Sequence, residues 1–238
     1  MSPHSPYCRG QVLRGYLVLP HAVPILVVLG ATAAFALVAG DGWPGVGTTF
    51  RLLGAMLGGQ LAIGALNELV DAGLDAVAKP DKPIPAGLVS RRGAWTVTAA
   101  GLLLMTALGA TFGVVPFLLL VVGTGAGIAY SLWFKRTIWS WVPYLVALPL
   151  LPIWVWSALD EVPAGAFAIY PIGAAAVVAI QIAQSLPDVA VDRASGVRTL
   201  AVALGERTAR IACWAALALA AGLAAGLAGP LTDRPGRV

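Results

Sequence analysis

Residues 93–134 read GAWTVTAAGLLLMTALGATFGVVPFLLLVVGTGAGIAYSLWF and contain no Asp, Glu, Lys or Arg. A transmembrane helix needs about 20 consecutive apolar residues, so this stretch is long enough for two. Pro116, shortly after Gly113, is a suitable place for the chain to break and reverse. The stretch lacks the alternation of polar and apolar residues that is typical of a membrane β-barrel. It therefore predicts two consecutive membrane-spanning helices, 93–115 and 116–134.

The rest of the chain continues this pattern on both sides. Of its 238 residues, 59% are hydrophobic and 11% are charged, which gives more apolar surface than a soluble domain of this size can bury. We expect an all-α fold: a polytopic transmembrane helical bundle of about seven spans, forming a single domain over residues 1–238. The predicted helices are 16–39, 50–75, 93–115, 116–134, 137–159, 163–190 and 207–230.

The basic residues predict the orientation of this bundle in the cell membrane. Twelve of the fifteen Lys and Arg residues fall before the first span or in the loops after the second, fourth and sixth. Positive charge accumulates on the cytoplasmic side of membrane proteins, so the N-terminus and these loops are expected in the cytoplasm. Because the basic residues lie in short loops between spans, nucleic acid is not an expected partner.

A ladder of polar side chains interrupts the end of the second span. The segment Asn67-Glu-Leu-Val-Asp71-Ala-Gly-Leu-Asp75 places Asn67, Asp71 and Asp75 four residues apart, on one face of a helix. Aspartates cost about 2.5 to 3.5 kcal/mol each at the centre of a bilayer and repel one another at this spacing, so a bound cation is expected. Oxygen ligands without His or Cys favour Mg²⁺, which often shares phosphate oxygens.

A second acidic pair, Asp188 and Asp192, repeats the spacing at the end of the sixth span, on the same predicted side. Two such pairs with basic residues nearby suit a diphosphate held through Mg²⁺. A single aspartate near a loop is more often merely solvated, but five ligand-type residues at helical spacing favour a site. His21, in the predicted first span, is expected to hydrogen-bond a neighbouring helix rather than substrate.

These motifs, in this order, resemble those of the UbiA superfamily of intramembrane prenyltransferases. The family carries N-x-x-x-D-x-x-x-D after helix two and D-x-x-x-D after helix six, matched here at 67–75 and 188–192. The flanking segments at 79–87, 130–136 and 192–200 are similar as well. The resemblance covers nearly the whole chain.

The resemblance implies a site for Mg²⁺ and a prenyl diphosphate, with a lipophilic acceptor and membrane lipid as further partners. It implies metal ligation by Asn67, Asp71, Asp75, Asp188 and Asp192. It places Tyr130 near the allylic carbon. The candidates for direct diphosphate contact are Asn67, Arg14, Lys79, Lys135, Arg136 and Arg193.

Two features depart from the family pattern. Glu68 stands where many members have Asp, and is expected to serve as a carboxylate still. The family usually has nine helices, so the seven predicted here are expected to lack the last two, and a partner protein or a second copy of the chain could replace the wall they form.

Several functions remain open at this stage. The leading one is transfer of the prenyl group to an aromatic or other lipophilic acceptor, and the alternative is a UbiA-type terpene cyclase that uses the same diphosphate. A CDP-alcohol phosphotransferase is disfavoured because its D-G-x-x-A-R signature is absent. An ion carrier is disfavoured because two acidic clusters at one membrane face suit a site better than a pore.

Overall fold

The computed structural model describes residues 7–159, 162–194 and 196–232, and these are helical with no strand. Seven of the helices in this part of the chain are long and apolar enough to cross a membrane, which confirms the predicted all-α bundle. The chain divides into two compact units, Met1–Thr124 and Gly125–Val238.

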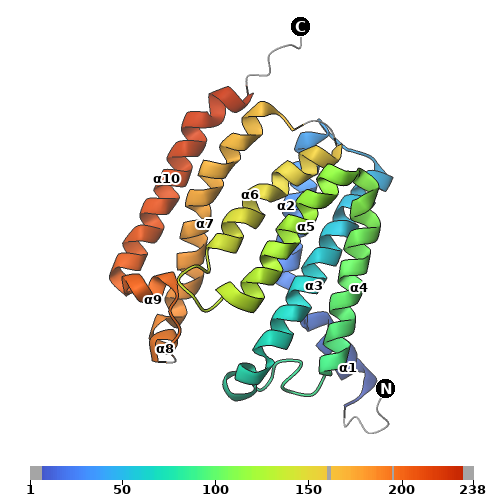
Figure 1. Cartoon of the computed structure of the whole chain (residues 1–238), viewed down its shortest axis with the longest axis vertical. Helices are drawn as coiled ribbons and strands as arrows, with labels where there is room; N and C mark the ends of the chain where they lie inside the picture. Colours follow the sequence, from blue (N-terminus) through green and yellow to red (C-terminus); the bar gives the residue numbers. More distant parts are fainter. Residues whose placement is uncertain (1–6, 160–161, 195, 233–238) are drawn as a thin grey trace. The chain divides into compact units, whose positions relative to one another are not determined.

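The first unit is built around one long helix. Its elements are α1 (Arg9–Val18), α2 (Ala22–Ala39), α3 (Val46–Ala78), α4 (Arg91–Gly109), the 3₁₀ turn η1 (Ala110–Phe112) and most of α5 (Val114–Ala129). Helix α3 has 33 residues, more than the predicted 50–75, and packs against α2 and α4 (Figure 1).

Close packing of α3 on α4 depends on two glycines. A Cβ added to Gly58 would come within 2.5 Å of the Met105 nitrogen, and one added to Gly101 within 2.6 Å of the Gly58 carbonyl oxygen. Small residues of this kind let helix backbones approach in lipid, where van der Waals packing is a main source of association. The glycines therefore set the distance between the two helices.

The predicted first span, 16–39, is divided in the structure between α1 and α2. Pro20 has no N–H to continue the helical hydrogen bonds, and His21 takes a left-handed conformation with φ of 60°. The main chain of Pro20 lies against Gly64 of α3, where a Cβ would clash. Thus α1 is a separate helix, and α2 is the spanning one.

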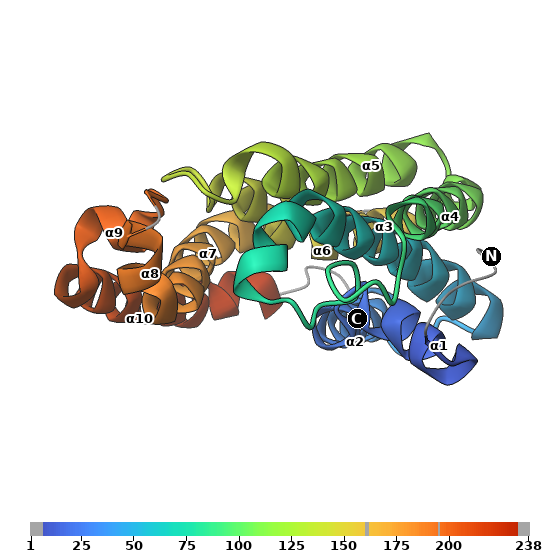
Figure 2. The ribbon, with the colours of Figure 1, turned by 90° about the horizontal axis from the view of Figure 1, so that it is seen from below.

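The second unit contains the end of α5, the π-helical turn η2 (Tyr130–Phe134), α6 (Val142–Leu159), η3 (Ala164–Ala168), α7 (Ile169–Ser185), η4 (Leu186–Asp188), α8 (Val189–Ala194), α9 (Leu200–Leu204) and α10 (Glu206–Thr232). Helix α7 packs along α10, with α8 and α9 at their ends (Figure 2). The predicted helix 163–190 is therefore divided into several elements, and Pro187 lies where α7 gives way to a 3₁₀ turn.

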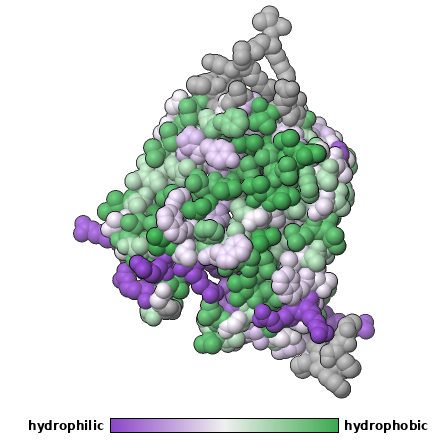
Figure 3. Space-filling view, viewed as in Figure 1, coloured by the Kyte–Doolittle hydropathy of each residue, from purple (hydrophilic) through white to green (hydrophobic). Residues whose placement is uncertain are grey.

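The outward-facing side chains of the spanning helices are largely hydrophobic, as Figure 3 shows for one face. Leu26 and Val27 of α2, Leu103 of α4 and Trp214 of α10 are each about two-thirds exposed. Such surface is stable against lipid tails and would not be in water.

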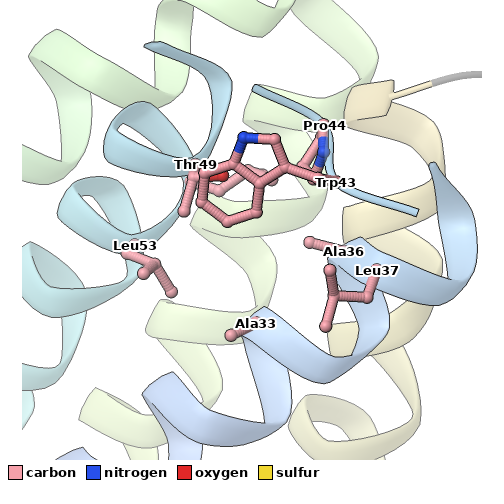
Figure 4. A pocket seen from close by; sticks show the side chains of 8 residues that line it. Ala33, Ala36, Leu37, Trp43, Pro44, Thr49 and Leu53 are labelled. Carbon is pink, nitrogen blue, oxygen red and sulfur yellow. The ribbon is translucent and has the colours of Figure 1, made fainter. Parts of the chain in front are cut away.

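A small apolar pocket lies where α2 ends and α3 begins (Figure 4). Trp43 and Pro44, from the connection between the two helices, are part of its lining, which is apolar except for Thr49. It lies at the start of α3, whereas the aspartates of that helix lie near its end, so the pocket is separate from the candidate site.

Candidate active site

The last turns of α3 carry the first acidic cluster, and its carboxylates are buried. Asp71 and Asp75 are 6% and 8% exposed, Glu68 is 1% exposed, and Asn67 is half-buried. The helix continues without interruption to Ala78, so the predicted spacing on one face is kept. Carboxylates buried to this degree need compensating positive charge or hydrogen bonds.

Lys82, in the loop that follows α3, supplies that compensation. Its Nζ lies 2.6 Å from Oε1 of Glu68 and 2.8 Å from Oδ2 of Asp75. The same Oε1 of Glu68 lies 3.0 Å from Nε2 of His21. His21 therefore contacts a neighbouring helix, as the sequence predicted.

The pairing keeps Lys82 protonated. Burial alone would lower the pKa of the Lys82 ammonium, but its hydrogen bonds to Asp75 and Glu68 and their charges outweigh burial, and the net pKa is raised. Because the folded pKa is raised, the stabilisation from this pairing is complete below the unfolded pKa of about 10.4 and is lost only as pH rises through the folded value.

Two further predicted phosphate contacts in the first unit are exposed. Lys79 follows α3 directly and donates its backbone N–H to the Asp75 carbonyl, at 2.8 Å. Arg14 lies on the short helix α1. Both side chains are exposed to solvent, whereas Lys82 is in contact with the cluster.

In the second unit, Tyr130 begins the π-helical turn η2. Its ring meets that of Tyr144 edge to face, with 5.0 Å between centroids. π-Helical turns inside helices are rare and often occur at functional sites. The turn closes through the bond from the Lys135 N–H to the Tyr130 carbonyl, at 2.9 Å, and so places the predicted pair Lys135 and Arg136 directly after the helix.

The second acidic pair lies on η4 and α8. Asp188 is exposed at the end of η4, Asp192 is half-buried on α8, and Arg193 is exposed next to it. The Arg198 N–H lies 3.4 Å from the Arg136 carbonyl oxygen, so the chain after α8 contacts the chain after η2. The segment that follows the second aspartate motif is therefore in contact with the Lys135–Arg136 segment.

The donor set fits Mg²⁺. The first cluster offers carboxylate oxygens, and Oε2 of Glu68 is buried without a hydrogen-bond partner. Among the described residues, no group of three His, Cys, Asp or Glu side chains is gathered around one point. Mg²⁺ usually keeps several waters or phosphate oxygens in its coordination shell, so it does not need a complete set of protein ligands.

Fold and cluster together define a class: a polytopic α-helical membrane protein with aspartates at the ends of two of its helices. The chain belongs to the UbiA prenyltransferase family, whose model matches residues 27–233.

Curated relatives agree with this assignment. The chain is 35% identical over 205 residues to the bacteriochlorophyll synthase 33 kDa chain of Cereibacter sphaeroides, covering 80% of this chain and 65% of that protein. It is 30% identical over 184 residues to the digeranylgeranylglyceryl phosphate synthase of Natronomonas pharaonis, covering 75% and 64%. The chain thus spans a little under two thirds of the length of these relatives.

Solved structures share the fold. A UbiA homologue from Archaeoglobus fulgidus bound to GPP and Mg²⁺ aligns with a TM-score of 0.76 at 23% identity, covering 93% of this chain and 80% of that one. A homologue from Aeropyrum pernix without ligand aligns with a TM-score of 0.74 at 19% identity, covering 88% and 80%.

Proposed function

We propose that the chain is a Mg²⁺-dependent intramembrane prenyltransferase, which ionises an allylic prenyl diphosphate and transfers the prenyl group to a lipophilic acceptor. The observation that carries this proposal is the buried carboxylate cluster Glu68, Asp71 and Asp75 in a chain of the UbiA family. Support comes from the A. fulgidus homologue, which was solved with GPP and Mg²⁺.

In this proposal Asn67, Asp71, Asp75, Asp188 and Asp192 hold the metal. Bound Mg²⁺ would supply positive charge that stabilises the negative charge developing on the leaving diphosphate. Arg14, Lys79, Lys135, Arg136 and Arg193 would bind diphosphate oxygens directly. Cationic groups aimed at developing charge lower the barrier most when they are positioned beforehand.

The prenyl cation must be kept from water, because water would quench it. Tyr130, on the π-helical turn, is proposed to face the allylic carbon, where an aromatic ring attracts a cation. Its contact with Tyr144 fixes the ring, which supports this role. The acidic clusters and basic loops are proposed to lie on the cytoplasmic side.

The test is turnover of labelled prenyl diphosphates by the purified protein with Mg²⁺. The acceptors to test are those that the names of the two relatives suggest, a bacteriochlorophyll precursor and a prenylated glyceryl phosphate. A prenylated acceptor, formed only with Mg²⁺ present, is the expected product. The two curated relatives are synthases that are not named as terpene cyclases, and hydrocarbon products formed without acceptor would contradict the transferase proposal.

A further inference from the structure

The junction between α1 and α2 is fixed onto α3 at two neighbouring points. Pro20 lies against Gly64 with no room for a Cβ, and His21 contacts Glu68 one helical turn further along. His21 holds a left-handed backbone conformation, which is uncommon for residues other than glycine. The junction therefore has a defined geometry that directs the imidazole to Glu68.

Glu68 in turn links this junction to the loop after α3. A single oxygen, Oε1, contacts both Nε2 of His21 and Nζ of Lys82, and Lys82 continues to Oδ2 of Asp75. Contacts thus run from His21 through Glu68 and Lys82 to Asp75, and they join three separate segments of the first unit. Glu68 is 1% exposed, so its charge is shielded from solvent and its contacts are weakened little by salt.

The loop is also held from its other end. The Tyr7 hydroxyl donates to the Ala86 carbonyl at 2.7 Å, and Val89, which is 1% exposed, lies against Gly15 of α1. Residues that flank α1 therefore reach this loop at two points: Tyr7 contacts Ala86, and His21 reaches Lys82 through Glu68. With its backbone fixed, the Lys82 ammonium has a defined position.

We propose that His21 and Glu68 are positioning residues, which hold Lys82 against Asp75 and so orient the Asp75 carboxylate for its metal. This inference rests on the proposed function, because Asp75 is taken as a metal ligand. Partners that orient metal ligands typically change metal affinity or activity 10- to 100-fold when they are removed. Glu68 stands where many family members have Asp, and its side chain is one methylene longer. It reaches both His21 and Lys82 from the buried face of α3.

The experiment compares Glu68→Gln, Lys82→Met and the double variant with wild type. We expect the Mg²⁺ concentration for half-maximal turnover to rise about 10-fold or more in Glu68→Gln. We expect the double variant to be no worse than Lys82→Met alone, because Glu68 acts through Lys82. Glu206→Gln, which breaks the exposed pair with Arg210 on α10, should leave the Mg²⁺ requirement unchanged.

A milder pair of variants covers the case in which Glu68→Gln does not fold. His21→Gln keeps a donor of similar reach and should retain the wild-type Mg²⁺ requirement. His21→Asn tolerates the left-handed backbone but is too short to reach Glu68, and its requirement should rise. Equal Mg²⁺ requirements in wild type, Glu68→Gln and His21→Asn would overturn the inference, as would additive effects of Glu68→Gln and Lys82→Met.

A second readout separates this inference from the proposed function. Geranyl diphosphate with Mg²⁺ should raise the melting temperature of the detergent-purified protein, and the Mg²⁺ concentration needed for that shift should rise in the same variants. Stabilisation that follows this pattern without any prenylated product would support the positioning role and contradict only the transferase assignment. A shift that needs the same Mg²⁺ concentration in every variant would contradict the positioning role itself.

Discussion

At the scale of single residues, the main feature of the candidate site is its buried negative charge. Asp71, Asp75 and Glu68 lie within three turns of one helix and are almost fully buried. Burying a carboxylate without a partner costs several kcal/mol. Each of these side chains therefore needs a cation, a hydrogen bond or a ligand to stabilise its charge. Lys82 meets this need for two of them.

The aspartates themselves give the first prediction. Asp71→Asn and Asp188→Asn each keep the side-chain shape but remove a negative charge, and we expect turnover to fall about 100-fold or more. Asp81→Asn, which changes an exposed aspartate of the loop after α3, is the matched control and should keep wild-type turnover. Initial rates with labelled prenyl diphosphate measure the effect. Near-wild-type rates for Asp71→Asn would remove this residue from the site.

The spacing of 67–75 predicted one helix face for Asn67, Asp71 and Asp75, and α3 keeps that face because it is continuous to Ala78. The same spacing at 188–192 predicted one continuous helix, but Asp188 ends the 3₁₀ turn η4 and Asp192 lies on α8. The spacing could not predict which basic side chain pairs with these carboxylates. Lys82 reaches Glu68 only because the loop folds back over the end of α3, and that path depends on contacts with α1. Glu68 was expected to act as a carboxylate, but nothing in the local pattern placed its oxygen between His21 and Lys82.

At the scale of elements, α3 is held by close backbone contact with α4. The contact involves Gly58 and Gly101, each of which lies against main-chain atoms of the other helix. Main-chain atoms cannot rotate away as a side chain can, so a substituent here must move a whole helix. Because α3 also carries the first acidic cluster, this packing supports the site at a distance.

The second prediction follows from that contact. Gly58→Ala and Gly101→Ala should each destabilise the fold by about 1 to 3 kcal/mol, because the added methyl forces α3 and α4 apart. Gly30→Ala is the matched control on α2, where nothing lies within 4 Å of the added Cβ. It should be neutral or slightly stabilising, since alanine favours helix over glycine. Thermal unfolding in detergent compares the three, and equal melting temperatures would contradict the packing account.

Hydropathy predicted these elements better than it predicted their ends. Uncharged runs mark where a helix can cross lipid, but Pro20 and Pro187 lie inside such runs and interrupt the helical hydrogen bonds there. The start of α3, at Val46, lies four residues before the predicted start at residue 50, and Arg51 is inside the helix in both. A charged residue near a membrane edge does not end a helix, because its side chain can reach the interface.

At the scale of the whole molecule, the count of spans was predictable because lipid imposes one length on every helix that crosses it. The choice of neighbours was not, since α3 against α4 and α7 against α10 depend on surface shape that composition does not record. The orientation is a separate matter, which rests on the distribution of basic residues.

Cysteine labelling tests the orientation and gives the third prediction. Cys8 is exposed just before α1, whereas Cys213 is buried in α10 and its thiol lies 3.4 Å from the Ala179 carbonyl oxygen. A membrane-impermeant maleimide should therefore label Cys8 in inside-out vesicles but not in intact cells. Cys8→Ser should abolish the labelling. Labelling of intact cells that disappears in Cys8→Ser would place the N-terminal segment outside.

The length of α3 has a consequence for kinetics. At 1.5 Å per residue, its 33 residues extend about 50 Å, while the hydrocarbon layer is only about 30 Å thick. The acidic end of the helix can therefore stand at the level of the lipid headgroups, where an amphiphile with a charged head and an oily tail also resides. Under the proposed function, the substrate would reach the site by diffusion in the plane of the membrane, and the rate should follow the mole fraction of prenyl diphosphate in the bilayer. Adding inert lipid at constant total substrate should slow the enzyme.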